Sequence, residues 1–143
     1  MKYMLDTVIF NKLLDDILSM QNLPSGEGYV ATHVQWDELS ATKNEKRRAG
    51  LLKQFATVSA ERHPTSSFAF DISRFDLAEW GSGDLFNQLK TALDAKNGRK
   101  TNNPKDALIA ETSIVKGFPL VTCDYDLAEV AKAFGGTVIH FKI

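Results

Sequence analysis

Two aspartates each follow a short apolar stretch of the sequence, at a point where a buried strand would end. Asp6 comes after "KYML", and Asp124 comes after "LVTC". An aspartate in this place caps the helix that follows, or it holds a cation together with other acids. If the two strands are neighbours in a parallel sheet, both carboxylates lie at the same edge of that sheet. Taken singly, either aspartate is more simply interpreted as a helix cap than as a cation ligand.

Two further acids stand near the starts of predicted helices. Asp106 is at the third position of the helix predicted for "PKDALIAETSI", and Glu38 follows the second predicted strand. As a first-turn acid, Asp106 would only complement the helix dipole, a contribution of about 0.3–1 kcal/mol. Helices that begin at the carboxyl edge of a parallel sheet bring their first residues to one crevice. Both acids are therefore candidates for the site of Asp6 and Asp124.

Four carboxylates in one crevice repel one another, and this repulsion indicates what they would bind. Two carboxylates about 4 Å apart repel by roughly 1 kcal/mol in water and by roughly 4 kcal/mol at an effective dielectric constant near 20. A shared proton or cation relieves the repulsion, and Mg²⁺ and Mn²⁺ prefer oxygen ligands. Mg²⁺ commonly keeps waters and substrate phosphates among its ligands. The four acids therefore predict a divalent-metal site that is open to a phosphodiester.

The elements that must position these acids alternate between strands and helices. Strands are predicted at residues 2–6, 29–34, 68–72, 118–123 and 137–143. Helices are predicted at residues 7–20, 35–42 with a continuation or restart through 44–62, 81–96, 104–116 and 126–135. Asn103 is predicted as the N-cap of the fourth helical segment, and Gly117 as its end. The pattern predicts an α/β protein, a three-layer α/β/α sandwich with a mostly parallel sheet of about five strands.

The composition is that of a single globular domain spanning residues 1–143. Apolar residues make up 43% of the chain, charged residues 24%, and the net charge is −1, which argues against disorder. No apolar run approaches the roughly 20 residues of a membrane span, and Asp6 interrupts what would be the apolar core of a signal peptide. We therefore expect a cytoplasmic protein with no membrane partner. The single cysteine, Cys123, excludes an internal disulfide and a cysteine-based zinc site.

Four segments resemble, in order and spacing, the acidic motifs of PIN-domain nucleases, and most closely those of VapC-like toxins of type II toxin–antitoxin pairs. The segments are "MLDTVIFNKLLD", "HVQWDELSAT", "NPKDALIAETSI" and "LVTCDYDLAEVA". The resemblance implies a five-stranded parallel sheet, RNA cleavage that depends on Mg²⁺ or Mn²⁺, and inhibition by a cognate antitoxin. It implies that the catalytic and metal-binding acids are Asp6, Glu38, Asp106 and Asp124, with Asp126 as an auxiliary metal ligand. Thr7 and Thr122 are then expected to orient these ligands without binding the metal ion themselves.

Two positions depart from the motifs of this family. Val8 stands where an asparagine is common, and "ELSAT" has no glycine after the Glu-Leu pair. Asp37 is a rival of Glu38, but neighbours on a helix diverge by about 100°, so that only one should face the crevice. We prefer Glu38, because the Glu-Leu pair matches and Leu39 fits the buried side.

On this interpretation Asp6, Asp106 and Asp124 bind the metal ion, and Glu38 binds it or accepts a proton from the attacking water. Two basic segments are then candidates for contacting the phosphates of an RNA backbone, although a basic run is more often a solvated helix face. The candidate backbone contacts are Lys43, Lys46, Arg47, Arg48, Arg99, Lys100 and Lys105.

The predicted function is that of a metal-dependent endoribonuclease acting as a toxin. The alternatives are a PIN-like nuclease of RNA processing and a catalytically inactive PIN-like binding module; the presence of all four acids counts against inactivity. We also expect a homodimer, because Ile9, Leu13, Ile17 and Met20 form an apolar stripe on the first predicted helix, and the resemblance implies dimers.

Overall fold

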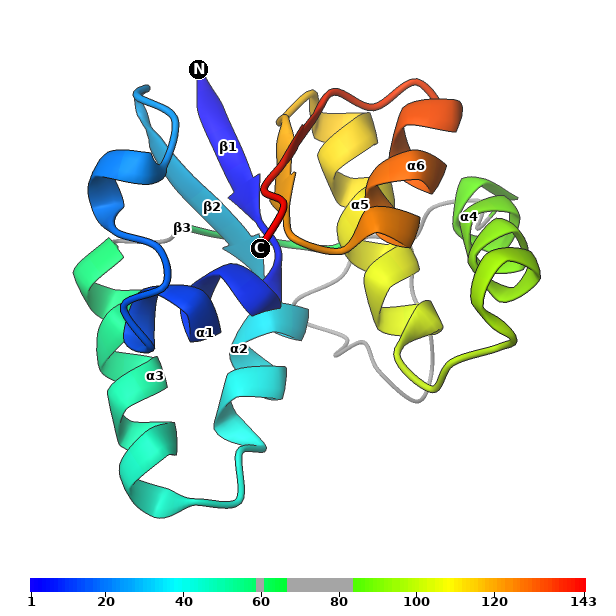
Figure 1. Ribbon diagram of the computed structural model, residues 1–143. Helices are drawn as coiled ribbons and strands as arrows, with labels where there is room; N and C mark the ends of the chain where they lie inside the picture. Colours follow the sequence, from blue (N-terminus) through cyan, green and yellow to red (C-terminus); the bar gives the residue numbers. More distant parts are fainter. Residues whose placement is uncertain (59–60, 67–83) are drawn as a thin grey trace.

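The computed structural model describes residues 1–58, 61–66 and 84–143 (Figure 1). Five strands form one sheet in the order β3-β2-β1-β4-β5, and all four pairings between them are parallel. The strands are β1 (Lys2–Leu5), β2 (Gly28–Thr32), β3 (Glu61–His63), β4 (Leu120–Thr122) and β5 (Val138–His140). The predicted parallel sheet is confirmed, and the strands that lead to Asp6 and Asp124 are neighbours in it.

Helices connect the strands and cover both faces of the sheet (Figure 1). They are α1 (Thr7–Leu14), α2 (His33–Ser40), α3 (Glu45–Val58), α4 (Asp84–Asn97), α5 (Asn103–Lys116) and α6 (Tyr125–Ala133), with a short 3₁₀ helix at Met20–Asn22. Among these described helices, none has both the length and the apolar composition to cross a membrane.

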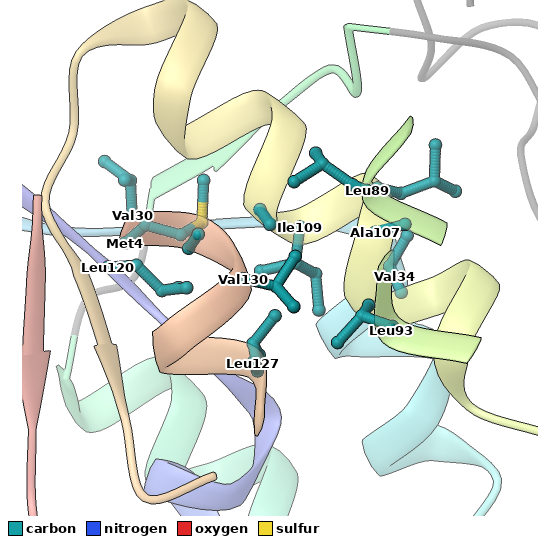
Figure 2. Close-up of a cluster of buried hydrophobic side chains, with 13 residues drawn as sticks. Met4, Val30, Val34, Leu89, Leu93, Ala107, Ile109, Leu120, Leu127 and Val130 are labelled. Atoms are coloured by element: carbon teal, nitrogen blue, oxygen red, sulfur yellow. The ribbon is translucent and has the colours of Figure 1, made fainter. Parts of the chain in front are cut away.

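Successive residues of the central strands enter two different cores. Met4 packs with apolar residues of α4, α5 and α6, in the cluster that Figure 2 shows. The next residue, Leu5, packs with residues of α1 and α3. Val30 and Ala31 of β2 divide in the same way. Because side chains of a strand alternate between its faces, both faces of the sheet are covered, and the predicted three-layer α/β/α sandwich is confirmed.

The first helix is shorter than predicted. α1 ends at Leu14, and Asp16 has a φ of 58°, in the left-handed region that does not continue a right-handed helix. Ile17 and Met20 therefore lie beyond α1 and are 48% and 40% exposed, whereas Leu13 is buried. The apolar stripe predicted along one helix is wrong, because two of its four members are not on that helix.

The third strand also lies elsewhere than predicted. The helix expected to reach residue 62 ends at Val58, and Glu61–His63 form the edge strand β3 beside β2. Tertiary contacts hold this polar strand: Lys2 forms an ion pair with Glu61 at 2.8 Å, and the Arg62 guanidinium lies 4.2 Å from the centre of the Trp36 ring. The strand predicted at residues 68–72 lies outside the described residues.

The ends of α5 agree with the sequence on one side only. Gly117 ends the helix with a φ of 75°, as its position predicts. Asn102, and not Asn103, occupies the N-cap position. Asn103 is buried, and its amide group donates to Asp94 Oδ1 and to Asn97 Oδ1, both at 2.8 Å. The N-cap prediction is wrong by one residue, because the Asn103 side chain binds the end of α4 instead.

Candidate active site

Asp6 is fixed at the carboxyl edge of the sheet by contacts on both sides. It is the N-cap of α1, and its Oδ1 accepts a hydrogen bond from the Thr7 N–H at 2.8 Å. Its Oδ2 accepts from the Thr122 hydroxyl at 2.7 Å, and its own N–H donates to the Val121 carbonyl at 3.0 Å. Only 5% of Asp6 is exposed. The carboxylate is therefore a helix cap whose position is set by β1 and β4 together.

Thr122, the last residue of β4, connects Asp6 with Asp124. Its hydroxyl donates to Asp6 and accepts from the Asp124 N–H at 3.0 Å. Asp124 is the N-cap of α6, and its Oδ1 accepts from the Leu127 N–H at 3.2 Å. Both strand-end aspartates thus cap helices. One capping bond uses a small part of the acceptor capacity of a carboxylate, so that capping does not prevent either from binding a cation.

Glu38 reaches the same edge through α2, which begins directly after β2. The Gln35 side chain accepts from the Thr32 N–H at 2.8 Å and donates to the Leu5 carbonyl at 3.0 Å. This bridge ties the first turn of α2 to the end of β1. One turn later, Glu38 Oε1 accepts from the Thr7 hydroxyl at 2.8 Å. Thr7 and Thr122 therefore each hold one carboxylate, in the supporting position that the sequence predicts.

The four acids line one open pocket. Asp106, in the first turn of α5, joins Asp6, Glu38 and Asp124 around a volume of about 450 Å³. The remaining lining residues are Thr7, Val8, Asn11, Lys12, Asn102, Cys123 and Ile143. Asp126 lies in the first turn of α6 and is not among the lining residues, nor is Asp37. The structure therefore brings four of the five predicted metal ligands together.

Burial and mutual repulsion raise the pKa values of two of these acids. Burial, and then the charges of Glu38 and Asp124, raise the pKa of Asp6 to about 7, although its hydrogen bonds from Thr122 and Thr7 lower it. Burial, and then the charges of Asp6, Glu38 and Asp124, raise the pKa of Asp106 to about 9. At neutral pH the pocket therefore holds protons unless a cation takes their place.

The pKa of Glu38 is also raised by burial, while the hydrogen bond from Thr7 and the charge of Lys105 lower it. The Lys100 charge likewise lowers the pKa of Asp106. Two of the basic residues predicted to contact RNA thus act electrostatically on the acids, which places both near the pocket.

Of the other predicted RNA contacts, Arg47 and Arg48 already form hydrogen bonds within the protein. Arg47 forms two bonds with Asp15, at 2.8 and 3.1 Å, and one with Asn11 Oδ1 at 3.0 Å. Arg48 donates to the Thr42 carbonyl at 3.1 Å. The remaining three residues, Lys43, Lys46 and Arg99, are exposed. Their contacts with RNA stay predictions.

The pocket fits a hard cation held by few protein ligands. In the described part of the chain, no three His, Cys, Asp or Glu side chains are placed to hold a metal ion among themselves. Mg²⁺ does not need three, because it is often bound by one or two carboxylates together with waters and phosphate oxygens. The chemistry of the lining fits this mode, since four carboxylates converge on the pocket and repel one another.

Sequence reasoning missed several lining residues. Asn11 and Lys12 follow Val8 by three and four positions, so that the three share one face of α1. The helical spacing of these residues from Val8, which follows the Asp6 cap by two positions, is the signal that would have identified them. Cys123 is half-buried and also lines the pocket. Its thiol has a raised pKa, mainly because of burial.

Replacing Thr122 with valine should lower the free energy of unfolding by about 1–3 kcal/mol, because the buried Asp6 loses a hydrogen-bond donor while the volume of the side chain is kept. Thermal or denaturant unfolding measures the change. Thr57→Val is the matched control, since Thr57 is exposed and its hydroxyl donates only to the Lys53 carbonyl, one turn earlier. Equal stability of the two variants would contradict a supporting role for Thr122.

Comparisons with known proteins agree with this architecture. The sequence profile of the PIN domain matches residues 3–133. The structure of VapBC2 from Rickettsia felis bound to a promoter DNA fragment has a chain that is 18% identical, with a TM-score of 0.62, over 99% of this chain and 100% of that one. No curated protein sequence matches significantly.

Two further solved structures are similar. One is VapBC-5 from Mycobacterium tuberculosis, a member of a toxin–antitoxin family, at 21% identity and a TM-score of 0.50 over 99% of this chain and 98% of that one. The other is FitAcB from Neisseria gonorrhoeae, at 13% identity and a TM-score of 0.52 over 98% and 97%. At such identities the likeness establishes the fold, and the chemistry has to be argued from the pocket.

Proposed function

The chain belongs to the PIN-domain family, and we propose that it is an endoribonuclease that hydrolyses RNA phosphodiester bonds with the help of Mg²⁺ or Mn²⁺. The pocket supports this proposal most directly. Four carboxylates converge in it. Two of them directly follow β1 or stand near the end of β4, one is in the first turn of α5, and one is further along α2. A cation stabilises the ionised forms of Asp6 and Asp106, whose pKa values are raised by burial and by the neighbouring carboxylates.

The residues that would hold the ion, directly or through bound waters, are Asp6, Asp106, Asp124 and Glu38. When bound, a divalent ion lowers the pKa of a water molecule and stabilises charge on the attacked phosphate. Glu38, which is half-buried and held by Thr7, either adds a ligand or accepts a proton from the attacking water. Thr122 keeps Asp6 in place by a hydrogen bond and orients Asp124 through its backbone N–H.

The surroundings of the pocket favour a polyanionic substrate. Lys105 and Lys100 lie near enough to Glu38 and Asp106 to lower their pKa values. Contacts between such side chains and phosphates give affinity without selecting a base sequence. The acids carry the chemistry in this proposal, and the lysines hold the RNA backbone beside them.

We further propose that a cognate antitoxin binds and inhibits this protein, which would make it the toxin of a pair. The similar structures of VapBC2, VapBC-5 and FitAcB support this proposal, because VapBC-5 is described as part of a toxin–antitoxin system. The homodimer also stays a prediction, and it no longer rests on an apolar stripe along α1.

The purified protein should cleave single-stranded RNA in millimolar Mg²⁺ or Mn²⁺ and should be inactive in excess EDTA, with activity restored by adding the ion back. Gel analysis of a labelled oligonucleotide measures the cleavage. Glu38→Gln should remove it, whereas Asp37→Asn, a neutralised acid one position earlier and outside the pocket, should retain it. Undiminished cleavage in EDTA would overturn the proposed function.

A further inference from the structure

We propose that Lys12 binds a phosphate group of the substrate inside the acidic pocket. This inference rests on the proposed function and assigns a role to a residue that is not one of the acids of the motifs. Lys12 is in the last turn of α1, the helix whose N-cap is Asp6. It lines the same pocket as the four acids and is half-buried there.

Lys12 is the basic residue within the lining of this pocket. Of the described residues that line it, four have acidic side chains, Lys12 has a cationic side chain, and the others have neutral side chains. A phosphodiester that approaches four carboxylates is repelled, and positive charge inside the pocket offsets this repulsion. A lysine suits this task, because its compact charge sits on a flexible stem that follows a phosphate oxygen.

Lys12 forms no ion pair with a neighbouring acid of the described residues, although its charge helps to lower the pKa of Asp15. Asp15, three residues further along the chain, forms a two-bond ion pair with Arg47, at 2.8 and 3.1 Å. If Lys12 only neutralised the acidic cluster, an ion pair with one of the four carboxylates would be expected. Its ammonium group therefore remains available to an anion that enters the pocket.

Hydrogen bonds from α3 hold the helix that carries Lys12 in place. Arg47 of α3 binds both Asp15 and Asn11, and the Asn11 amide group donates to the Thr7 carbonyl at 3.3 Å. Both the oxygen and the nitrogen of the Asn11 amide are thus hydrogen-bonded, whereas Lys12, which also lines the pocket, has no such bond among the described residues. The backbone is held in place, and the side chain keeps the freedom to meet a ligand.

Binding of a labelled single-stranded RNA oligonucleotide in Mg²⁺ tests the inference. Cleavage is suppressed by Asp106→Asn in every protein compared, so that affinity is measured alone. Adding Lys12→Gln should weaken binding roughly tenfold, as expected for the loss of one charged contact. It should also reduce the slope of log affinity against log salt concentration by about 0.7, the value for one phosphate contact on a single strand.

Lys132→Ala on α6 is the control for charge, since Lys132 is exposed and outside the pocket. Lys12→Arg should restore most of the affinity because it keeps the charge, and an unchanged melting temperature of Lys12→Gln excludes misfolding. Equal affinities and salt slopes for Lys12→Gln and Lys132→Ala would overturn the inference. Failure of the wild-type protein to cleave RNA is a separate result, which overturns the proposed function and leaves the binding measurement intact.

Discussion

Replacing Asp106 with asparagine should reduce RNA cleavage at least about a hundredfold and, in EDTA at neutral pH, should stabilise the fold. The loss of cleavage follows from losing a metal ligand that supports several kcal/mol of transition-state stabilisation. The gain in stability follows from the proton that Asp106 must take up when the metal-free protein folds. Asp106 has a higher pKa than Asp6, about 9, because of burial and three neighbouring acids. In EDTA at neutral pH the folded protein must keep Asp106 protonated, whereas the unfolded chain ionises it, and asparagine avoids this cost of at least about 1–2 kcal/mol.

Asp106 is a sharper choice than Asp6 for this test. Asp6 accepts two hydrogen bonds, from Thr7 and from Thr122, which an amide would disturb. The hydrogen bonds among the described residues include none to the Asp106 side chain, so its replacement by an isosteric amide loses little besides charge.

Melting curves in EDTA and in millimolar Mg²⁺ compare wild type, Asp106→Asn and the control Asp37→Asn. Mg²⁺ should raise the midpoint of the wild type and of the control, because a ligand that binds only the native state stabilises it by mass action. It should do little for Asp106→Asn. If Mg²⁺ shifted all three midpoints equally, or if Asp106→Asn were destabilised in EDTA, Asp106 would not belong to a metal site.

The affinity for Mg²⁺ should increase about tenfold per pH unit between pH 7 and pH 9, because Asp106, with a pKa of about 9, must release its proton to bind the ion. The increase should be steeper below pH 7, where Asp6 is also protonated. Isothermal titration calorimetry in two buffers with different ionisation enthalpies measures both the affinity and the number of protons released. A pH-independent affinity across this range would show that neither acid is a ligand.

The same pKa values fix how the metal-free stability depends on pH. Both acids have folded-state pKa values above the usual value near 3.8. Their protonated forms therefore favour the fold, fully so below that usual value, and this contribution is lost as pH rises through about 7 for Asp6 and about 9 for Asp106. The metal-free protein should become less stable from acidic to alkaline pH, and Mg²⁺ should flatten that dependence.

The sheet and the convergence of the four acids follow from local patterns in the sequence. Alternating strands and helices of this length allow few topologies other than a parallel sheet, and such a sheet collects its strand ends at one edge. Asp6 and Asp124 could therefore be expected at one edge, and as neighbours on the condition that their strands pair, which β1 and β4 do. Adjacent residues of a helix face different directions, so only one of Asp37 and Glu38 could line the pocket, and the Glu-Leu pair with a buried Leu39 favoured Glu38.

Other features depend on tertiary contacts that leave no periodic signal. The strand Glu61–His63 is polar and short, and partners distant in sequence, Lys2 and Trp36, hold two of its residues. The end of α1 could not be read from apolar spacing, because Leu18 continues the helical period and is buried although the chain turns at Asp16. Lys12 was overlooked because the apolar pattern of α1 describes the face that packs on the sheet, while Lys12 lies on the face that lines the pocket.

The backbone beneath Asp6 belongs to the middle of the sheet, with Met4 N–H bonded to the Pro119 carbonyl at 2.8 Å and Asp6 N–H bonded to the Val121 carbonyl at 3.0 Å. Amides in such a position exchange with solvent deuterium only when a large cooperative unit opens. The strand backbone beneath the pocket can therefore deform only at a large cost in free energy. A protein that silences this one would accordingly act by occlusion, blocking the entrance or inserting a side chain among the acids, and it would leave the sheet unchanged.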